Sequence, residues 1–298
     1  MMFKPEGIIP AVVSPVDDGG NIREESYRRL INYLIDNGVH GLFINGSQGE
    51  FYALTVEEKQ KVLEIAIDEA NGRVPVYAGV GAVTTREAVK LAKMAENAGA
   101  YALSAITPYY IKPDEDELYE YYREIAESVH IPVLLYANPS RTNVPLSVKL
   151  VSRLAEIDNI IGIKDSSGDL TLTAEYIRLL SNKGFYVLAG RDTLILGTLV
   201  YGGTGAIAAT ANVVPKLVVS IYEYFKKGDL KSALDAQYKL APLRIAFDLG
   251  TFPVVIKEAV RLIGFDLGPA IRPIKEIRPE KREELKRILL DLGLSIVS

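Results

Sequence analysis

An apolar run ends in a single lysine within the segment Ile160-Ile-Gly-Ile-Lys-Asp-Ser-Ser-Gly168, where small polar residues follow Lys164 directly. Such a run predicts a buried strand. The other lysines fall in helical, loop or terminal segments, and we expect water to reach them. Burial disfavours the charged form of an ammonium, and a neutral amine at a strand end can attack a carbonyl to form a Schiff base. The alternative is a structural lysine that reaches out of the strand end towards Asp165.

Other apolar runs of strand length occur along the chain, and amphipathic segments separate them. The eight predicted strands are Ile8–Val13, Leu42–Asn45, Val74–Val80, Ala102–Thr107, Pro132–Tyr136, Ile160–Lys164, Tyr186–Ala189 and Gly205–Ala209. The clearest predicted helices are Glu24–Asp36, Val56–Ala70, Arg86–Asn97 and Glu115–Ser128. Thr55 and Glu58 form a capping-box signature before the second of these helices. Strand starts recur roughly every 20 to 34 residues, the length of one βα unit. This order predicts an α/β protein, a (β/α)8 TIM barrel rather than an open doubly wound sheet.

The chain continues past the eighth strand for longer than a barrel requires. Pro215–Gly228 is predicted to close the barrel, which gives a catalytic domain of residues 1–228. Residues 229–298 are predicted to form a C-terminal helical extension packed on the barrel, with apolar faces that could also meet a second subunit. Its predicted helices are Leu230–Phe247, Phe252–Ile263 and Pro279–Leu292.

The composition is typical of a folded globular domain, with 48% hydrophobic and 24% charged residues among 298. A net charge of -4 offers no broad basic field to nucleic acid or an anionic membrane. The chain has no cysteine, which excludes disulfides and thiolate sites. It has no apolar run of membrane-spanning length and no signal-peptide core. We therefore expect a cytoplasmic enzyme without nucleic-acid or membrane partners.

The active site of a (β/α)8 barrel forms where its strands end. Lys164 ends the sixth predicted strand, Tyr136 ends the fifth, and Arg141 follows soon afterwards. The second strand leads into Gly46-Ser-Gln-Gly-Glu50, a turn whose N–H groups and Ser47 hydroxyl suit a carboxylate. An amine nucleophile, a phenol that can shuttle protons and an arginine that can clamp a carboxylate are what a Schiff-base lyase needs.

Each of these residues also has an ordinary structural explanation. The chain holds 17 tyrosines, so Tyr136 and Tyr110 also fit packing roles, and Arg141 also fits a surface ion pair. The two histidines, His40 and His130, precede predicted strands two and five, near the opposite end of the barrel, where we expect structural or exposed roles. Without histidine or cysteine at the strand ends, we predict no metal site and no zinc aldolase.

Five motifs occur in one order along the chain: Gly46-Ser-Gln-Gly-Glu50, Thr107-Pro-Tyr-Tyr110, Leu134-Leu-Tyr-Ala-Asn-Pro139, Gly162-Ile-Lys-Asp165 and Gly190-Arg-Asp192. With them, the chain resembles the dihydrodipicolinate synthase / N-acetylneuraminate lyase family of class I, pyruvate-dependent aldolases from Lys4 to Leu294. The resemblance implies an imine between Lys164 and pyruvate or another 2-oxo acid, with no cofactor beyond that imine. It also implies a homotetramer built as a dimer of dimers.

The resemblance assigns roles to further residues. Tyr136 matches the tyrosine that passes protons at the imine and at the acceptor carbonyl. Ser47 matches a threonine or serine that links this tyrosine by hydrogen bonds and holds the 2-oxo-acid carboxylate. Tyr110 matches the tyrosine that, in the synthases, reaches the site of a neighbouring subunit. Gly190 and Ile207 match positions that line the bound oxo acid.

The resemblance leaves the acceptor aldehyde open. Arg141 matches the arginine with which dihydrodipicolinate synthases hold the carboxylate of aspartate semialdehyde, which favours condensation of pyruvate with that aldehyde in lysine biosynthesis. Gln48 stands where those synthases have a second threonine, and Lys164-Asp-Ser-Ser-Gly168 is more similar to sugar-acid aldolases. The alternatives are cleavage of 2-keto-3-deoxy sugar acids or N-acetylneuraminate, in which Gln48 and Asn143 would meet hydroxyls, a 2-oxo acid hydro-lyase, and a catalytically silent binding protein.

The resemblance also bears on regulation. Bacterial synthases inhibited by lysine commonly carry histidine and asparagine in the effector cleft. The matching positions here hold Val56 and Val83, although Glu87 fits. We predict no useful inhibition by lysine.

Overall fold

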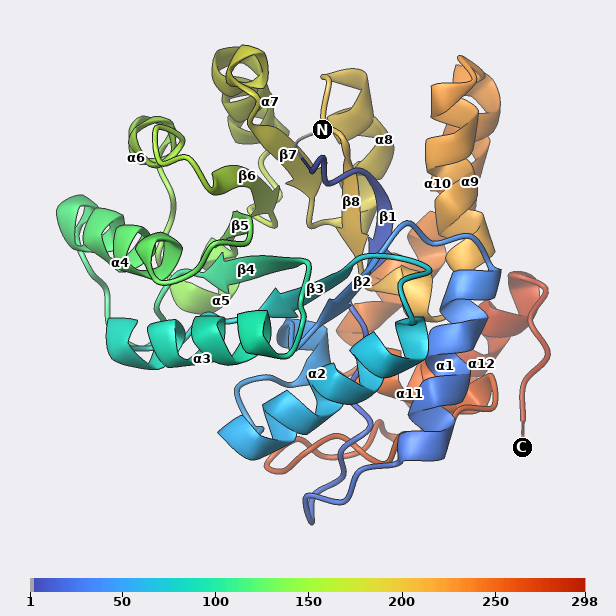
Figure 1. Ribbon diagram of the computed structural model, residues 1–298. Coiled ribbons are helices and arrows are strands. Elements are labelled where there is room, and N and C mark those ends of the chain that lie inside the picture. The colour runs from blue at the N-terminus through green and yellow to red at the C-terminus, as the bar shows by residue number, and fades with distance from the viewer. Residues whose placement is uncertain (1–2, 298) are drawn as a thin grey trace.

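A computed structural model describes residues 3–297 and places eight parallel strands in one sheet that closes on itself (Figure 1). The strand order is β1-β8-β7-β6-β5-β4-β3-β2, and a parallel bridge between Ala11 and Phe43 joins the two ends. The strands are β1 (Gly7–Pro10), β2 (Leu42–Ile44), β3 (Val76–Gly79), β4 (Ala102–Ile106), β5 (Val133–Ala137), β6 (Ile160–Asp165), β7 (Tyr186–Ala189) and β8 (Gly205–Ala208). The predicted TIM barrel is confirmed, and all eight predicted strands form.

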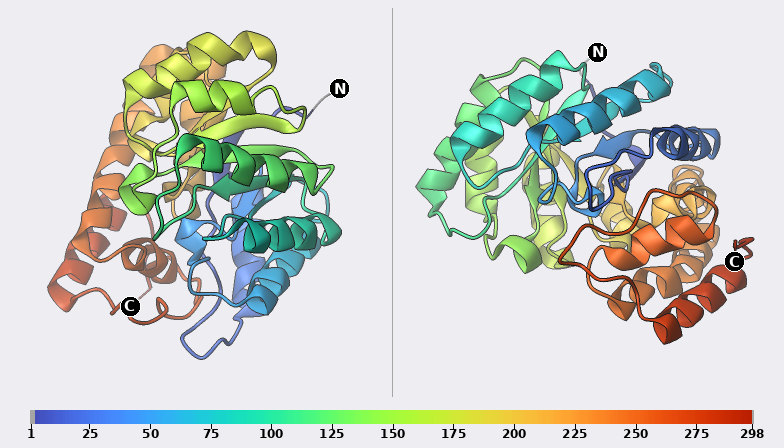
Figure 2. Two further views of the ribbon diagram at one scale, coloured as in Figure 1. Left: turned by 90° about the vertical axis from the view of Figure 1, so that its left-hand side faces the viewer. Right: turned by 90° about the horizontal axis from the view of Figure 1, so that it is seen from below.

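Helices surround the strands (Figure 2). They are α1 (Glu24–Asp36), α2 (Val56–Ala70), α3 (Thr85–Asn97), α4 (Glu115–Glu127), α5 (Pro139–Thr142), α6 (Val148–Leu154), α7 (Leu170–Leu180), α8 (Ile195–Val200) and α9 (Pro215–Lys226). Helices α1 and α2 have the predicted bounds. A capping box at Thr55 and Glu58 fixes the start of α2, and Asn71 in the left-handed conformation ends it.

Side chains alternate between the inside of the barrel and the side that faces the helices. Within the sheet, Leu134 on β5 pairs with Gly162 on β6, and Tyr136 pairs with Lys164. Leu134 belongs to a small buried cluster inside the barrel, to which most strands contribute a residue. The larger core cluster lies between the strands and the helices. Since residues two apart on a strand share a face, Tyr136 and Lys164 point into the barrel, one layer nearer the carboxyl ends of the strands.

The last helices are α10 (Leu230–Ile245), α11 (Val254–Leu262) and α12 (Pro279–Asp291), and α10 lies beside α9 (Figure 1). Helix α10 ends two residues before its predicted end, in a 3-10 turn at Ala246–Leu249, and α11 starts two residues after its predicted start. The Gln237 side chain of α10 accepts the Leu196 N–H at 3.0 Å and donates to the Asp192 carbonyl oxygen at 2.9 Å. The extension thus packs on the barrel, while a domain boundary at residue 228 stays a prediction.

The expectation that water reaches every lysine other than Lys164 is wrong. Lys257 on α11 is buried because a carboxylate, that of Glu50, pairs with its ammonium inside the protein. Lys59 on α2 is also largely buried. Neither lysine ends a strand, so burial by itself does not distinguish Lys164.

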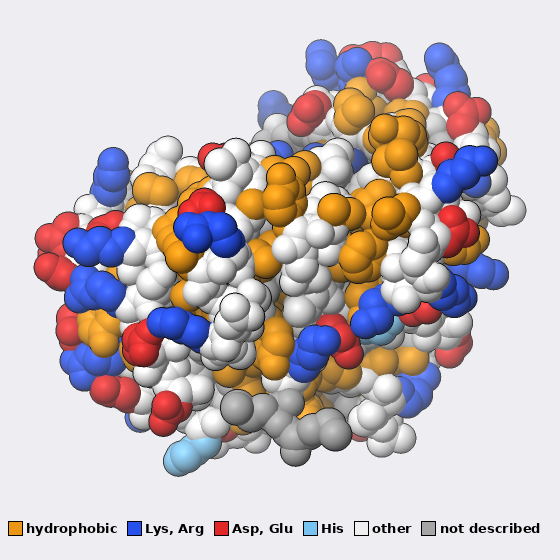
Figure 3. All heavy atoms as spheres, turned by 90° about the horizontal axis from the view of Figure 1, so that it is seen from above, with side chains coloured by type: hydrophobic (Ala, Val, Ile, Leu, Met, Phe, Trp, Pro, Cys, Tyr) orange, Lys and Arg blue, Asp and Glu red, His pale blue; other side chains and the backbone are white. Residues whose placement is uncertain are grey.

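Within residues 3–297, no helix is long and apolar enough to cross a membrane. On the face seen in Figure 3, basic and acidic side chains are interspersed with hydrophobic ones, and neither sign of charge is concentrated. This face therefore has no basic field of the kind that attracts nucleic acid.

Candidate active site

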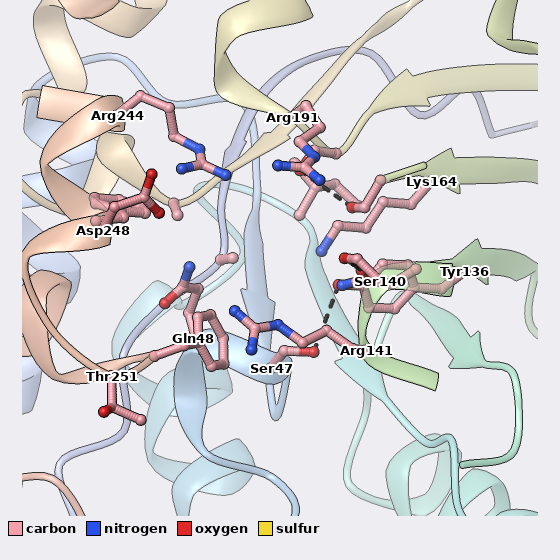
Figure 4. Close-up of a pocket in the computed structure, with 18 of the residues that line it drawn as sticks. Ser47, Gln48, Tyr136, Ser140, Arg141, Lys164, Arg191, Arg244, Asp248 and Thr251 are labelled. Atoms are coloured by element: carbon pink, nitrogen blue, oxygen red, sulfur yellow. Dashed lines mark hydrogen bonds between the residues drawn. The ribbon is translucent and has the colours of Figure 1, made fainter. Parts of the chain in front are cut away.

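A cavity of about 610 Å³ opens where the strands end and the C-terminal helices approach the barrel (Figure 4). Seven residues selected from the sequence line it: Ser47, Gln48, Tyr136, Arg141, Lys164, Gly190 and Ile207. The remaining charged and aromatic lining residues, which the sequence analysis did not select, are Arg191, Arg244, Phe247, Asp248 and Phe252. Among the residues given a site role from the sequence, Tyr110 and Asn143 do not line the cavity.

Lys164 and Tyr136 lie side by side at the base of this cavity. Lys164 Nζ is 4.0 Å from the centre of the Tyr136 ring and 4.7 Å from that of Phe43, and the residue is only 4% exposed. Asp165 lies next to Lys164 on β6 and points to the opposite face of the strand, where its carboxylate accepts a hydrogen bond from Thr173 Oγ1 at 2.6 Å. Within residues 3–297, Lys164 forms no ion pair, so the alternative of a structural lysine paired with Asp165 is wrong.

The Tyr136 phenol is held by hydrogen bonds. Asn138 Nδ2 donates to the Tyr136 hydroxyl at 3.0 Å, and Ser47 Oγ lies 3.5 Å from it. Burial raises the pKa of the phenol, but the Lys164 ammonium and these hydrogen bonds outweigh burial and hold the pKa below its ordinary value of 10.0. A phenol with a lowered pKa can release a proton and take it back, as a proton shuttle must.

The turn after β2 presents donors to the cavity. Ser47–Gly49 is a 3-10 turn, and the N–H groups of Ser47 and Gln48 have no acceptor in the described part of the chain. A Cβ at Gly49 would lie 3.0 Å from both Ser14 Oγ and the Val12 carbonyl oxygen, so the backbone here fits closely against the loop after β1. Unused N–H groups and a hydroxyl at the start of a helical turn suit a carboxylate.

Arginines enter the cavity from three elements. Arg141 comes from α5, Arg191 follows β7 and Arg244 comes from α10, and the guanidinium groups of all three are drawn towards its centre (Figure 4). Arg141 stacks on the Phe252 ring, with 4.1 Å from the guanidinium carbon to the ring centre, and Arg244 lies 4.9 Å from that of Phe247. In the part of the chain that the structure describes, none of the three arginines pairs with a carboxylate, which makes the cavity suitable for an anionic ligand.

Two small features shape the wall beside Lys164. A Cβ at Gly190 would lie 2.0 Å from Ser166 Oγ, so no side chain fits at that position. Asp192 accepts hydrogen bonds from the N–H and the hydroxyl of Thr210 and thereby ties the end of β7 to the end of β8, from which Ile207 enters the cavity. Both predicted lining positions therefore face the lysine from neighbouring strands.

Tyr110 and the histidines lie elsewhere. The Tyr110 side chain is 98% exposed on a backbone with a positive φ of 75°. His40 accepts the Ile8 N–H at the amino end of β1, and His130 is exposed before β5. The histidines are thus at the end of the barrel opposite the cavity, as predicted. Within residues 3–297 no cluster of three His, Cys, Asp or Glu could hold a metal, and metal independence stays a prediction.

The sequence contained a signal for one of the missed arginines and not for the other. Arg191 directly follows Gly190 in the turn after β7, so the rule that sites form at strand ends would have selected it. Arg244 and Phe252 lie beyond the barrel strands, and helical periodicity does not indicate which residue of α10 reaches the strand ends.

The fold and the cavity together define a (β/α)8-barrel enzyme with its site at the carboxyl ends of the strands, built around a buried lysine beside a phenol. Residues 4–292 match the dihydrodipicolinate synthetase family, and the chain belongs to that family of lyases.

Relatives and solved structures cover nearly the whole chain. A 4-hydroxy-tetrahydrodipicolinate synthase from Methanopyrus kandleri is 42% identical over 296 residues, which are 99% of this chain and 98% of the relative. The crystal structure of dihydrodipicolinate synthase from Aquifex aeolicus has a TM-score of 0.94 at 33% identity and covers 98% of this chain and 100% of its own. YagE, a prophage protein of the same family from E. coli K12 crystallised with pyruvate, has a TM-score of 0.93 at 36% identity, with 97% and 99% covered.

Proposed function

We propose that this protein is a 4-hydroxy-tetrahydrodipicolinate synthase, which condenses pyruvate with aspartate semialdehyde through a Schiff base on Lys164. The observation that carries the proposal is a buried lysine beside a phenol of lowered pKa, in a cavity that also holds carboxylate donors. The 42% identity to a synthase of that name supports the choice of reaction.

The first half of the reaction binds and activates pyruvate. The N–H groups and the hydroxyl of the Ser47 turn bind its carboxylate. The neutral Lys164 amine attacks the C2 carbonyl, and Tyr136 delivers the proton with which the former carbonyl oxygen leaves as water. The Tyr136 phenolate left by this step then takes a proton from the methyl group of the imine, which gives an enamine whose CH2 carbon is nucleophilic. The covalent imine takes the place of a cofactor.

The second half joins the two substrates. Arg141 binds the carboxylate of aspartate semialdehyde and directs its aldehyde towards the enamine. A carbon–carbon bond forms between the enamine CH2 and the aldehyde carbon, and Tyr136 donates its proton to the new alkoxide. The amino group of the former semialdehyde then attacks the imine carbon and displaces Lys164, which closes the ring and frees the lysine.

A second candidate function, cleavage of a 2-keto-3-deoxy sugar acid, is favoured by the polar wall opposite Lys164. Gln48, Asp248 and Arg244 all line the cavity, and together they offer donors and acceptors to a chain of hydroxyls (Figure 4). The same lysine and tyrosine would serve this reaction, with N-acetylneuraminate as a larger variant of the substrate.

Borohydride trapping tests the nucleophile. The enzyme is incubated with pyruvate, reduced with borohydride and digested, and mass spectrometry locates the adduct. We expect the adduct on Lys164 and none in Lys164→Ala or in Lys164→Arg, which keeps the charge but is not a nucleophile. An adduct of equal yield in Lys164→Ala would refute the assignment.

Pyruvate consumption with a panel of aldehydes tests the acceptor. The panel contains aspartate semialdehyde, glyceraldehyde and N-acetylmannosamine at equal concentrations. Preference for the semialdehyde is the expected result, whereas preference for a sugar aldehyde would replace the synthase by the aldolase. A hydro-lyase would consume no aldehyde, and a silent binding protein would turn over nothing.

A further inference from the structure

A buried ion pair lies directly behind the Ser47 turn. Lys257 Nζ on α11 is 2.8 Å from Glu50 Oε2, and the two side chains are 1% and 0% exposed. The same ammonium donates to the Val16 carbonyl oxygen at 2.9 Å, and Glu50 Oε1 accepts the Ile271 N–H at 2.7 Å. The pair therefore joins the loop after β1, the turn after β2 and the segment between α11 and α12.

A pair so deeply buried is a costly way to stabilise a fold. Burial lowers the pKa of Lys257, and the Glu50 carboxylate opposes that effect by favouring the ammonium. Replacing a buried ion pair by apolar side chains is often neutral or stabilising, because each charge loses its hydration on burial. The position of the pair, rather than its energy, therefore indicates its role.

Glu50 directly continues the turn that presents carboxylate donors. Its backbone is left-handed, with φ 54°, a conformation that is strained for a residue with a side chain. The Ser14 hydroxyl donates to the Gly49 carbonyl oxygen, so the peptide bond just before Glu50 is held as well as the Glu50 side chain. Neither Glu50 nor Lys257 lines the cavity, so both act on a substrate through the turn.

We propose that Lys257 and Glu50 are positioning residues that hold the Ser47 turn, and with it the 2-oxo-acid carboxylate, in the geometry for attack by Lys164. The C-terminal extension is thereby part of the pyruvate site, although its residues come from beyond the barrel strands. This inference rests on the proposed function, since it assigns the pyruvate carboxylate to the Ser47 turn.

The test measures borohydride trapping and steady-state rates against pyruvate concentration for Lys257→Met, Glu50→Gln and the double variant. The double variant removes both charges and leaves neither buried alone. In these variants we expect two quantities to rise at least tenfold: the pyruvate concentration that gives half-maximal trapping, and the KM for pyruvate. We expect kcat at saturating pyruvate to fall less than threefold. A general loss of stability would not produce this division between KM and kcat.

Arg282→Met is the matched control, because it breaks a different ion pair to the same helix, α11. Arg282 Nε pairs with Glu258 Oε1 of α11 at 2.6 Å, away from the cavity, so its loss should lower thermal stability and change the KM for pyruvate less than twofold. Wild-type enzyme that is not trapped by pyruvate would refute the proposed function itself. If wild-type enzyme is trapped but the double variant has an unchanged KM for pyruvate, only this inference is refuted. The same holds if none of the three variants folds, because the ion pair would then serve folding.

Discussion

Arg141→Ala separates recognition of the acceptor from the chemistry on Lys164. The guanidinium of Arg141 faces the cavity, stacks on Phe252 and has no carboxylate partner in residues 3–297, so we expect it to bind the acceptor carboxylate. A hydrogen bond to a charged group contributes about 1.5–3 kcal/mol. Because Arg141 is exposed to water, the expected loss lies near the lower end, about 2 kcal/mol, which corresponds to a roughly 30-fold lower kcat/KM for aspartate semialdehyde.

The assay varies each aldehyde at saturating pyruvate. Glyceraldehyde has no carboxylate for Arg141 to bind, so its kcat/KM should change less than about twofold. Arg141→Lys keeps the charge but loses the planar fork and the stacking, and should lie between wild type and Arg141→Ala. The pyruvate concentration that gives half-maximal borohydride trapping should not change. Equal losses with both aldehydes, or no loss with the semialdehyde, would show that Arg141 does not bind the acceptor carboxylate.

The other predictions concern the phenol, the effector cleft and the subunit contact. Tyr136→Phe should lower kcat by about 10²- to 10⁴-fold in steady-state assays, since it removes the proton shuttle, and a loss below tenfold would contradict that role. The pKa of Tyr136 is lower in the native protein than in the unfolded chain, so the unfolded chain holds more protons between the two values. The difference in free energy of unfolding between wild type and Tyr136→Phe should therefore increase as the pH rises from the native pKa of Tyr136 towards 10, and it should be lost as the pH falls through that native pKa. A difference that stays constant with pH in chemical denaturation would refute this. Lysine should not inhibit, because Val56 and Val83 offer it no hydrogen bonds, and an inhibition constant in the micromolar range would overturn that prediction. Tyr110→Ala should lower activity and weaken a tetramer in sedimentation, because a partner subunit is expected to cover this exposed side chain, and unchanged assembly and activity would argue against the contact.

The barrel could be predicted because its signals are local and repeated. Each strand is a short apolar run, each helix has its own periodicity, and the order of βα units leaves few possible topologies. The same topology converts positions far apart in the chain into neighbours, which is how Ser47, Tyr136 and Lys164 could be placed together from the order of the strands. The end of α10 moved by two residues because a 3-10 turn at Ala246–Leu249 follows the helix, and β1 ends at Pro10, three residues before its predicted end.

The far wall of the cavity could not be predicted in this way. Arg244, Asp248 and Phe252 reach the strand ends only because α10 turns back over the barrel, and that path depends on packing between α9 and α10 rather than on any local pattern. The choice of acceptor depends on this wall. It follows that the reaction class can be inferred from the strand ends, whereas the aldehyde must be determined by experiment.

The two lysines of the site region explain why burial alone does not identify a nucleophile. Lys257 is more deeply buried than Lys164, but a carboxylate at 2.8 Å favours its charged form and a carbonyl oxygen occupies a second donor. Lys164 lies instead over the faces of two aromatic rings, with no carboxylate within ion-pair distance in the described chain and an open cavity in front of its nitrogen. An amine must reach a carbonyl to react, and of these two lysines only Lys164 lines the cavity. The carboxylate beside Lys257 thus makes that lysine an anchor for the site, and the absence of such a partner among residues 3–297 leaves Lys164 available for chemistry.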